Sequence, residues 1–288
     1  MTELALETRN GAVTGRRLDC FTSDAAADAL QRSFEGYFVP MHLDGDAFER
    51  RFRAEHVDRR ESYIYVQGSQ IAGVILVARR GRASRVAAMA CAPAFRRYGL
   101  GTAMLETALV SARERGDETM TLEVLEPNIA ARALYEKLSF RVVRELVGYT
   151  HDGERQSSDG ELQECSAETY AQALSRQAFA DLPWMLSADT ACGQTLPARF
   201  FHVDNGSFIW LASAGEKDLT IRFLFTVSER CRQGLANLLL CRLERRFPDR
   251  KWSISPVVPD GMGSDFLRGK GFEFHELRQI EMVRALDE

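Results

Sequence analysis

The sequence predicts an α/β protein of the α+β type, in which a mixed, mostly antiparallel sheet is flanked by helices and this arrangement occurs twice in tandem. Alternating apolar residues mark three consecutive strands at 62–67, 71–77 and 85–91, and the turn-like connections between them indicate antiparallel pairing. A glycine-rich turn after the third strand opens an amphipathic helix at 102–115. The same order of strand, glycine turn and helix returns about 135 residues later, which indicates a repeat.

Length and composition limit the class of protein. The 288 residues fit two domains of ordinary size, and 45% hydrophobic with 27% charged residues is typical of a soluble globular protein. The net charge of −4 argues against a nucleic acid or an anionic membrane surface as a partner, although Arg96-Arg97 permits a local basic groove. We therefore expect neither kind of partner.

Cysteine usage and the N-terminal residues indicate the compartment. The six cysteines are scattered, with no Cys-x-x-Cys pair and no cysteine–histidine spacing of a zinc site, and the five histidines lie far apart. Residues 1–10 include acidic side chains and no apolar segment, and no run approaches the ~18 apolar residues that a membrane span needs. These features predict a cytoplasmic protein without a signal peptide, a membrane span or a metal site.

Helices are predicted on both sides of the three strands. Two precede the strands at 23–34 and 44–57, where apolar residues recur at helical spacing, and the first follows the start signal Thr22-Ser23-Asp24. After the strands we expect a helix, a strand, a helix and the last strand of the first half, at 102–115, 119–125, 129–138 and 140–147.

The loop Arg96-Arg97-Tyr98-Gly99-Leu100-Gly101-Thr102 has the features of an anion-binding site. Two glycines permit a tight turn that brings backbone N–H groups close to a ligand, the next helix presents the positive end of its dipole, and two arginines add charge. A P-loop is disfavoured because no Gly-Lys-Ser/Thr triplet follows, and a dinucleotide loop is disfavoured because Met104 stands where a small residue is needed. A plain turn between strand and helix remains the alternative.

The pattern Arg-x-x-Gly-x-Gly at 96–101 resembles the coenzyme A pyrophosphate loop of the GNAT superfamily of N-acetyltransferases. A second stretch resembles the family's strand–helix–strand signature, with Ser139 in place of the usual glycine. It consists of Asn128, Ala131, Leu134, Tyr135, Glu136, Lys137, Leu138 and Phe140. The two motifs have the order and spacing of that family, and the resemblance covers the first half of the chain.

The resemblance implies acetyl-CoA (coenzyme A in its acetylated form) as the cofactor that donates the acetyl group. In that family the backbone at the end of the third strand pairs with the pantetheine arm, and the N–H groups of the loop hold the pyrophosphate. The residues expected at the cofactor site are Met89, Ala90, Cys91, Arg96, Arg97, Tyr98, Gly99, Leu100, Gly101, Thr102 and Asn128.

Tyr135 stands at the position of the family's usual general acid. A tyrosine hydroxyl with a pKa of ~10 can protonate a departing thiolate, whose thiol has a pKa of ~8.5 or above. The alternative for Tyr135 is an aromatic ring that packs beside Leu134 and leaves its hydroxyl in solvent.

Glu123 resembles the glutamate that several members use as general base, directly or through water, to take the proton of an alkyl ammonium. Strand alternation offers an equal alternative, an exposed glutamate between two buried neighbours, and Glu126 is the other candidate base. Cys91 has no evident histidine partner, and the family's usual route is direct transfer in a ternary complex, which we therefore expect.

The second half of the chain repeats the first. Gly234 lies 135 residues after Gly99, and Phe272 lies 132 residues after Phe140. Two motifs that recur at nearly the same offset indicate a tandem repeat.

The polar segment 151–160 is the expected linker between a catalytic domain at 1–150 and a second domain at 161–288. In the second domain Cys231 replaces the first arginine of the glycine loop, and Leu267 replaces the tyrosine of the second motif. We therefore expect a degenerate copy without a general acid.

Together these features predict an N-acetyltransferase with one active centre that transfers an acetyl group from acetyl-CoA to a primary amine. The acceptor amine belongs to a small molecule or a peptide. In the GNAT fold the first two helices flank the acceptor side, so the resemblance makes candidates for substrate contact of Tyr37, Phe38, Met41 and His42 in the expected acceptor loop and of Asp44 and Asp46 at the start of the next helix. A solvated loop is the alternative for each of them. The two aspartates suit a cationic amine. The chain is expected to be a monomer or a homodimer. The alternative function is a non-catalytic acyl-CoA-binding or interaction protein of two modules.

Overall fold

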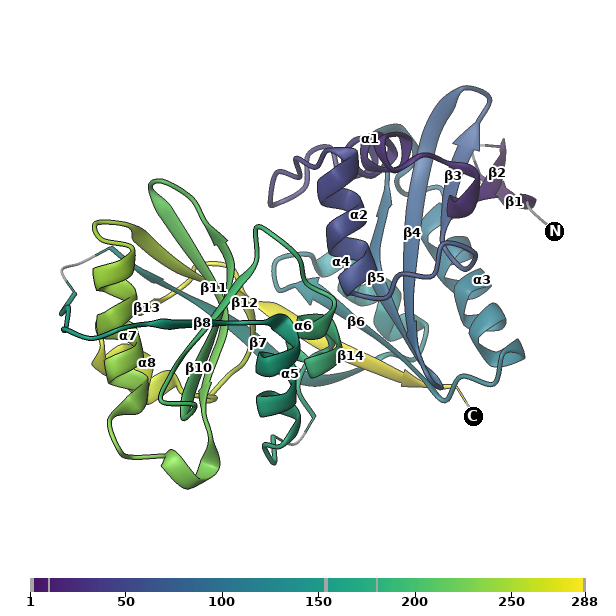
Figure 1. Ribbon diagram of the computed structural model, residues 1–288. Helices are drawn as coiled ribbons and strands as arrows, with labels where there is room; N and C mark the ends of the chain where they lie inside the picture. The colour runs from purple at the N-terminus through teal and green to yellow at the C-terminus, as the bar shows by residue number, and fades with distance from the viewer. Residues whose placement is uncertain (1–2, 10, 153–154, 180, 287–288) are drawn as a thin grey trace. The chain divides into compact units, whose positions relative to one another are not determined.

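The chain divides into two units, each with its own hydrophobic core, in the computed structural model (Figure 1). Unit 1 contains residues 1–143 and 281–288, and unit 2 contains residues 144–280. The structure describes residues 3–9, 11–152, 155–179 and 181–286. The segment expected as a linker, 151–160, lies within unit 2, and its residues 153–154 are outside the described part of the chain.

The elements of unit 1 are β1 (Glu3–Thr8), β2 (Gly11–Arg17), α1 (Ser23–Ser33), α2 (Gly45–Ala54), β3 (Tyr63–Gln67), β4 (Gln70–Arg80), β5 (Ala83–Cys91), α3 (Leu100–Glu114), β6 (Thr119–Leu125), α4 (Ile129–Lys137) and β14 (Gln279–Ala285). The strand order is β1-β2-β3-β4-β5-β6-β14. Neighbours from β1 to β5 pair antiparallel, whereas β5 and β6 are parallel.

The helices and strands predicted between residues 23 and 138 are confirmed. Periodicity did not predict the hairpin of β1 and β2, because its side chains are largely exposed.

Side-chain caps determine where three helices of unit 1 begin. Each cap oxygen accepts a hydrogen bond from a backbone N–H of the first turn, which has no acceptor within the helix. Thr22 caps α1, as the start signal predicted, Asp44 caps α2 and Asn128 caps α4.

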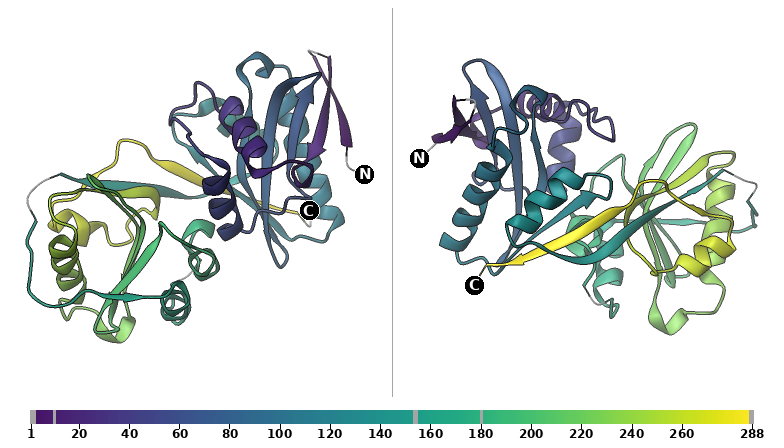
Figure 2. Two further views of the ribbon diagram at one scale, coloured as in Figure 1. Left: turned by 45° about the horizontal axis from the view of Figure 1, so that its top comes forward. Right: turned by 180° about the vertical axis from the view of Figure 1, so that it is seen from behind.

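Strand β4 is the centre of unit 1 because both of its faces are buried. On one face Val74 packs with Leu30 of α1 and Phe48 of α2. On the other face Gly73 meets α3, where a Cβ added to this glycine would lie 3.3 Å from the sulfur of Met104. Helices α1 and α2 therefore cover one face of the sheet and α3 covers the other, as Figures 1 and 2 show.

The elements of unit 2 are β7 (Arg141–His151), β8 (Gln163–Cys165), α5 (Ala167–Ser175), α6 (Ala188–Cys192), β9 (Arg199–Val203), β10 (Ser207–Ala214), β11 (Asp218–Thr226), α7 (Leu235–Arg246), β12 (Lys251–Pro259), α8 (Ser264–Gly269) and β13 (Glu273–Phe274). The strand order is β7-β12-β11-β10-β9-β8, and β13 also pairs with β7. Strands β11 and β12 are parallel, at the place that β5 and β6 occupy in unit 1.

The expectation that 140–147 closes the sheet of the first half is wrong. From Arg144 onward β7 belongs to unit 2, where it pairs with β12. The strand hydrogen-bonded to β6 is β14, from the other end of the sequence. Two strands of similar pattern compete for such an edge, and their alternation does not say which one pairs there.

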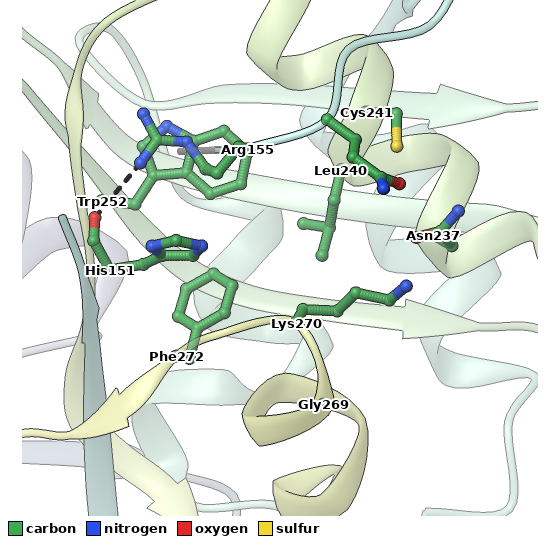
Figure 3. A pocket seen from close by; sticks show the side chains of 10 residues that line it. His151, Arg155, Asn237, Leu240, Cys241, Trp252, Gly269, Lys270 and Phe272 are labelled. Atoms are coloured by element: carbon green, nitrogen blue, oxygen red, sulfur yellow. Dashed lines mark hydrogen bonds between the residues drawn. The ribbon is translucent and has the colours of Figure 1, made fainter. Parts of the chain in front are cut away.

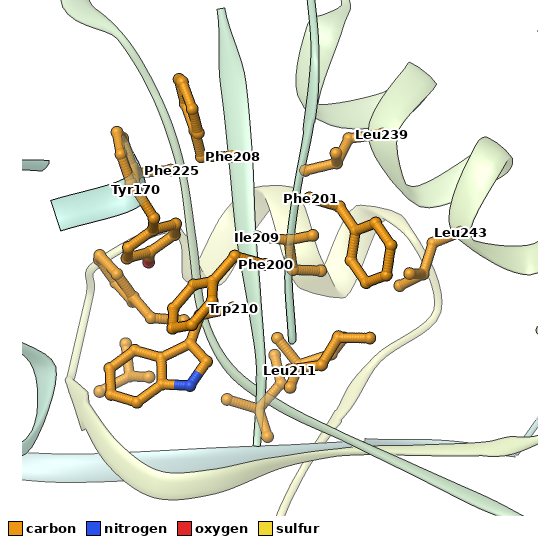
Figure 4. Close-up of a cluster of buried hydrophobic side chains, with 14 of the residues drawn as sticks. Tyr170, Phe200, Phe201, Phe208, Ile209, Trp210, Leu211, Phe225, Leu239 and Leu243 are labelled. Carbon is orange, nitrogen blue, oxygen red and sulfur yellow. The ribbon is translucent and has the colours of Figure 1, made fainter. Parts of the chain in front are cut away.

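Aromatic side chains fill much of the core of unit 2 (Figure 4). The ring of Tyr170 in α5 lies 5.0 Å from Phe200 and 5.3 Å from Phe225, and Phe200 stacks on Trp210 at 5.7 Å. Leu239 of α7 joins the same core from the opposite side of β9 and β10. Unit 2 thus has a complete core of its own.

The two units repeat the same local geometry, which confirms the tandem repeat. Gly99 precedes α3 with a φ of 91°, and Gly234 precedes α7 with a φ of 79°. The N–H of Phe140 donates to the carbonyl of Tyr135 at 3.0 Å, and the N–H of Phe272 donates to that of Leu267 at 3.1 Å. Among the described residues no helix is both long and apolar enough to cross a membrane.

Candidate active site

The glycine loop of unit 1 leads into α3 with backbone N–H groups that have no acceptor within the helix. Arg97 and Gly99 both have a left-handed backbone, with φ of 71° and 91°, and this turn leads directly into α3. The first hydrogen bond of the helix is made by the N–H of Ala103, so the N–H groups of Leu100 to Thr102 have no acceptor within the helix. A Cβ added to Gly99 would meet no atom within 4 Å. The loop is therefore suited to bind an anion.

Strands β5 and β6 separate beside this loop. They pair only from Ala83 to Val86 of β5, opposite Thr119 to Leu122 of β6, although β5 continues to Cys91. On its other edge β5 stays paired with β4 as far as Cys91. The edge of β5 that faces β6 is therefore unpaired over Ala87–Cys91, where an extended chain with amide groups can add to the sheet.

Tyr135 is buried in α4, with 6% of its surface exposed. Burial, with smaller contributions from Tyr37 and Cys91 nearby, holds the pKa of its hydroxyl well above the usual range. The hydroxyl is thus protonated at neutral pH, as a general acid requires. The ring is packed in the core beside Phe140, and the role of the hydroxyl as an acid stays a prediction.

Asn128 connects the start of α4 to the expected acceptor loop. Its Oδ1 accepts a hydrogen bond from the N–H of Ala131 at 3.2 Å, and its side chain is also hydrogen-bonded to the hydroxyl of Tyr37. Tyr37 belongs to the loop between α1 and α2, in which Phe38 and Val39 are exposed. The structure thus brings the loop between α1 and α2 and Tyr135 into one neighbourhood, which the sequence left open.

Arg96 has a contact that the sequence did not indicate. Its Nε donates to the carbonyl of Cys91 at 2.9 Å, and its Nη2 donates to the carbonyl of Glu35. The guanidinium therefore ties the end of α1 to the start of the glycine loop. Its direct contact with a phosphate stays a prediction.

Cys91 lies at the unpaired end of β5, beside the glycine loop. Burial raises the pKa of its thiol to about 11, although Arg96 and the N–H of Gly101 act in the opposite direction. A thiol with this pKa is a poor nucleophile at neutral pH. Direct transfer without a cysteine intermediate, as expected, fits this environment.

Glu123 belongs to a buried ion triad. The guanidinium of Arg85 is 2.7 Å from a carboxylate oxygen of Glu123 and 2.7 Å from one of Glu55, and their side chains are 2%, 3% and 7% exposed. The alternative of an exposed glutamate at position 123 is therefore wrong. Glu123 lies one residue beyond Leu122, the last position of β6 that pairs with β5, whereas Arg85 is paired with Thr121. Glu126, the other candidate base, is exposed at the end of β6.

The sequence analysis missed Arg85 and Glu55. A detectable signal was present for Arg85, which stands at an inward position of a strand whose neighbours are small and apolar. A charge at such a position requires a buried partner of opposite sign. Glu55, just after α2, carried no comparable signal.

The corresponding region of unit 2 lacks these groups. Leu267 is buried at the position of Tyr135, Gly263 precedes α8 where Asn128 caps α4, and Cys231 stands at the position of Arg96. In the described part of the chain, no group of three His, Cys, Asp or Glu side chains is placed to hold a metal ion. The groups suited to acyl transfer therefore gather in unit 1.

Two parallel strands that separate beside a glycine loop, with a buried tyrosine on the helix that follows the second of these strands, are typical of the acyl-CoA N-acyltransferase fold. Residues 26–140 match the acetyltransferase (GNAT) family, and the chain belongs to this family. It is 31% identical to an N-alpha-acetyltransferase of Sulfurisphaera tokodaii over 133 residues, which are 44% of this chain and 76% of that relative.

Two further similarities cover very different shares of this chain. An N-alpha-acetyltransferase of Saccharolobus solfataricus is 40% identical over 74 residues, which are 25% of this chain and only 44% of that relative. A tandem GNAT protein from the clavulanic acid biosynthesis pathway has a TM-score of 0.64 and 16% identity, over 95% of this chain and 98% of that protein. At this identity the second similarity shows the fold alone, and it extends over both units.

Proposed function

We propose that this chain is an N-acetyltransferase that transfers an acetyl group from acetyl-CoA to a primary amine by direct attack in a ternary complex, with its active centre in unit 1. The main support for the proposal is that unit 1 contains three features together: the open glycine loop, the unpaired edge of β5 and the buried Tyr135. When bound, acetyl-CoA supplies the acetyl group as an activated thioester.

The residues of unit 1 fit that cofactor. The N–H groups of Leu100, Gly101 and Thr102 are proposed to bind the pyrophosphate, with Arg97 and Tyr98 beside it, since the helix dipole and the absent Cβ of Gly99 favour an anion there. The backbone of Met89, Ala90 and Cys91 is proposed to bind the pantetheine amides along the unpaired edge of β5.

Tyr135 is proposed to donate a proton to the departing thiolate. Its raised pKa keeps the proton in place at neutral pH, and its burial excludes water that would otherwise supply it. Asn128 holds the first turn of α4 and so positions the tyrosine.

Glu123 is proposed to accept the amine proton through a water molecule. Its ion pair with Arg85 orients the carboxylate toward the point where β5 and β6 separate, so the residue serves both as a base and as an anchor. Glu126 is the competing base, and comparison of Glu123→Gln with Glu126→Gln decides between them. The variant that removes the rise of kcat/KM with pH identifies the base.

The amine to test first is the α-amino group of a peptide, because two relatives carry the name N-alpha-acetyltransferase. The exposed Phe38 and Val39 beside Tyr37 offer an apolar surface to a first side chain. A panel of peptides with different N-terminal residues, polyamines and aminoglycosides tests both the activity and this choice.

The deciding experiment uses one substitution at two equivalent positions. Gly99→Glu and Gly234→Glu introduce the same negative side chain into left-handed turns that are open on the outside. We expect thiol release from acetyl-CoA in the presence of an amine to disappear in Gly99→Glu and to persist in Gly234→Glu. Activity retained in Gly99→Glu, or thiol release that no amine accelerates, contradicts the proposal.

A further inference from the structure

The guanidinium of Arg96 lies against the chain at the end of α1. Its Nη2 donates to the carbonyl of Ser33, the last residue of α1, at 3.5 Å, and to the carbonyl of Glu35. A Cβ added to Gly36 would lie 3.9 Å from Nη1 of the same guanidinium. Its Nε donates to the carbonyl of Cys91 at 2.9 Å. The arginine thus connects the end of α1 to the end of β5.

The surroundings of Arg96 are suited to a cation. The last carbonyls of a helix have no donor within the helix, and they form the negative end of its dipole. A guanidinium satisfies such carbonyls with charge-assisted hydrogen bonds. In the described part of the chain the acceptors of Arg96 are carbonyl oxygens and no carboxylate. A phosphate contact by Nε or Nη2 would require that these hydrogen bonds break.

The chain that Arg96 holds is the beginning of the α1–α2 loop, which consists of residues 34–44. The middle of this loop is held by the hydrogen bond between Tyr37 and Asn128. Its end is held by Gln31 of α1, whose Nε2 donates to the carbonyl of Leu43 at 3.1 Å. The loop is therefore fixed at its beginning, its middle and its end.

A loop fixed in this way offers an acceptor amine a surface that is formed in advance. Phe38 and Val39 are exposed within it, and α4, which the loop contacts through Asn128, carries Tyr135. If the beginning of the loop is released, binding of the amine must also order the loop, and ordering costs conformational free energy. Loss of the Arg96 contacts should therefore weaken amine binding.

Unit 2 differs at the corresponding position. Cys231 replaces Arg96 there, and its sulfur lies 3.6 Å from the carbonyl of Val227, only four residues earlier. The cavity of about 220 Å³ in unit 2 has Trp252 in its wall, and neither Cys231 nor Gly234 is among its lining residues in the described part of the chain (Figure 3). The repeat thus keeps the glycine turn but not the arginine contact.

We propose that Arg96 is a positioning residue for the acceptor amine and not a ligand of the cofactor phosphates. By joining the end of α1 to the end of β5, it keeps the α1–α2 loop ready for the amine near Tyr135. The assignment rests on the proposed function of unit 1. The exposed Arg97 is then the arginine of the loop that attracts the pyrophosphate.

Two substitutions in the glycine loop test the proposal. Calorimetry with coenzyme A measures cofactor affinity, and steady-state kinetics at saturating acetyl-CoA measures KM for the best amine of the panel above. Arg96→Met should raise this KM about tenfold, as loss of a charge-assisted hydrogen bond does, and leave kcat and coenzyme A affinity within about twofold. Arg97→Met should do the reverse, because it weakens coenzyme A binding and leaves KM for the amine unchanged.

Arg32→Met is the matched control. Arg32 lies in the last turn of α1, and its ion pair with Asp28 is exposed, so its loss should change neither constant. Arg96→Lys keeps a charge and three donors without the planar fork, so it should raise KM only about threefold. Thermal unfolding shows whether each variant is folded, and Arg96→Lys decides if Arg96→Met is not.

Failure of this inference differs from failure of the proposed function. If the unsubstituted chain binds no coenzyme A, or if no amine accelerates thiol release, the proposed function is wrong and the inference with it. The inference alone is overturned if Arg96→Met weakens coenzyme A binding as much as Arg97→Met, if the Arg96 variants leave KM for the amine unchanged, or if Arg32→Met raises KM equally.

Discussion

The hydroxyl of Tyr37 is hydrogen-bonded to the side chain of Asn128, which joins the loop after α1 to the first turn of α4. The loop carries the exposed Phe38 and Val39, and α4 carries Tyr135. One hydrogen bond thus connects the expected acceptor loop to the helix that bears the proposed acid. The ring of Tyr37 also packs edge-on against the rings of Phe34 and Phe38.

Replacing Tyr37 with Phe should impair amine binding. A hydrogen bond contributes about 1 kcal/mol net, so KM for the amine should rise about fivefold at saturating acetyl-CoA. Steady-state kinetics measures this value. Tyr63→Phe in β3 removes a hydroxyl from another partly buried tyrosine and is the matched control. An unchanged KM for every amine would show that the Tyr37–Asn128 bond does not order the acceptor loop.

Replacing Arg85 with Met should strongly destabilise the chain. It leaves two buried carboxylates, Glu55 and Glu123, without their cation, and breaking a buried pair in this way costs about 3–5 kcal/mol. Urea unfolding measures the loss. Arg82→Met is the control, because its ion pair with Glu118 is exposed and such pairs contribute about 0–1 kcal/mol. Equal effects of the two changes would mean that the triad is not a buried electrostatic unit.

Replacing Tyr135 with Phe should lower kcat by about 10²–10⁴-fold, the usual contribution of a positioned acid, and leave coenzyme A affinity nearly unchanged. Its pKa also predicts a pH profile. Because burial raises this pKa, the acid form persists through the range around pH ~10 in which an ordinary tyrosine titrates. The kcat of the unsubstituted enzyme should therefore show no alkaline loss from Tyr135 up to that pH. Full activity of Tyr135→Phe would exclude its role as the acid.

Cys91 should react slowly with iodoacetamide. At pH 8 a thiol whose pKa is raised from 9.0 to about 11 has about 100-fold less thiolate than an ordinary cysteine. Mass spectrometry of timed samples should show the exposed Cys192 and Cys231 modified first. In the urea-unfolded chain the three cysteines should react at similar rates. Rapid modification of Cys91 in the folded chain would contradict the environment described for it.

Features that depend on neighbouring residues could be predicted from the sequence. The glycine turn before α3, the Thr22 cap and the repeat offset follow from local backbone and hydrogen-bond requirements, and the structure has them. The same holds for the replacement of Tyr135 by Leu267, which is visible once the two motifs are aligned.

Features that depend on distant partners could not be predicted. Whether Glu123 is exposed or buried depends on Arg85 and on Glu55 beyond α2, which lie far from it in sequence. The position of Tyr37 depends on a hydrogen bond to α4. The pairing of β6 with β14 rather than with β7, the next strand in the sequence, is likewise a choice between two segments of similar alternation.

The strand beside β6 is β14, from the end of the sequence, and this has a consequence for synthesis of the chain. A ribosome makes β6 early, but the strand beside it, β14, consists of residues 279–285 and arrives only after unit 2 has been made. Until then the edge of β6 is open to other chains, so chaperone protection matters most for the part that emerges first. It follows that a premature stop codon within unit 2 removes the strand beside β6 from unit 1 without altering any residue of the glycine loop.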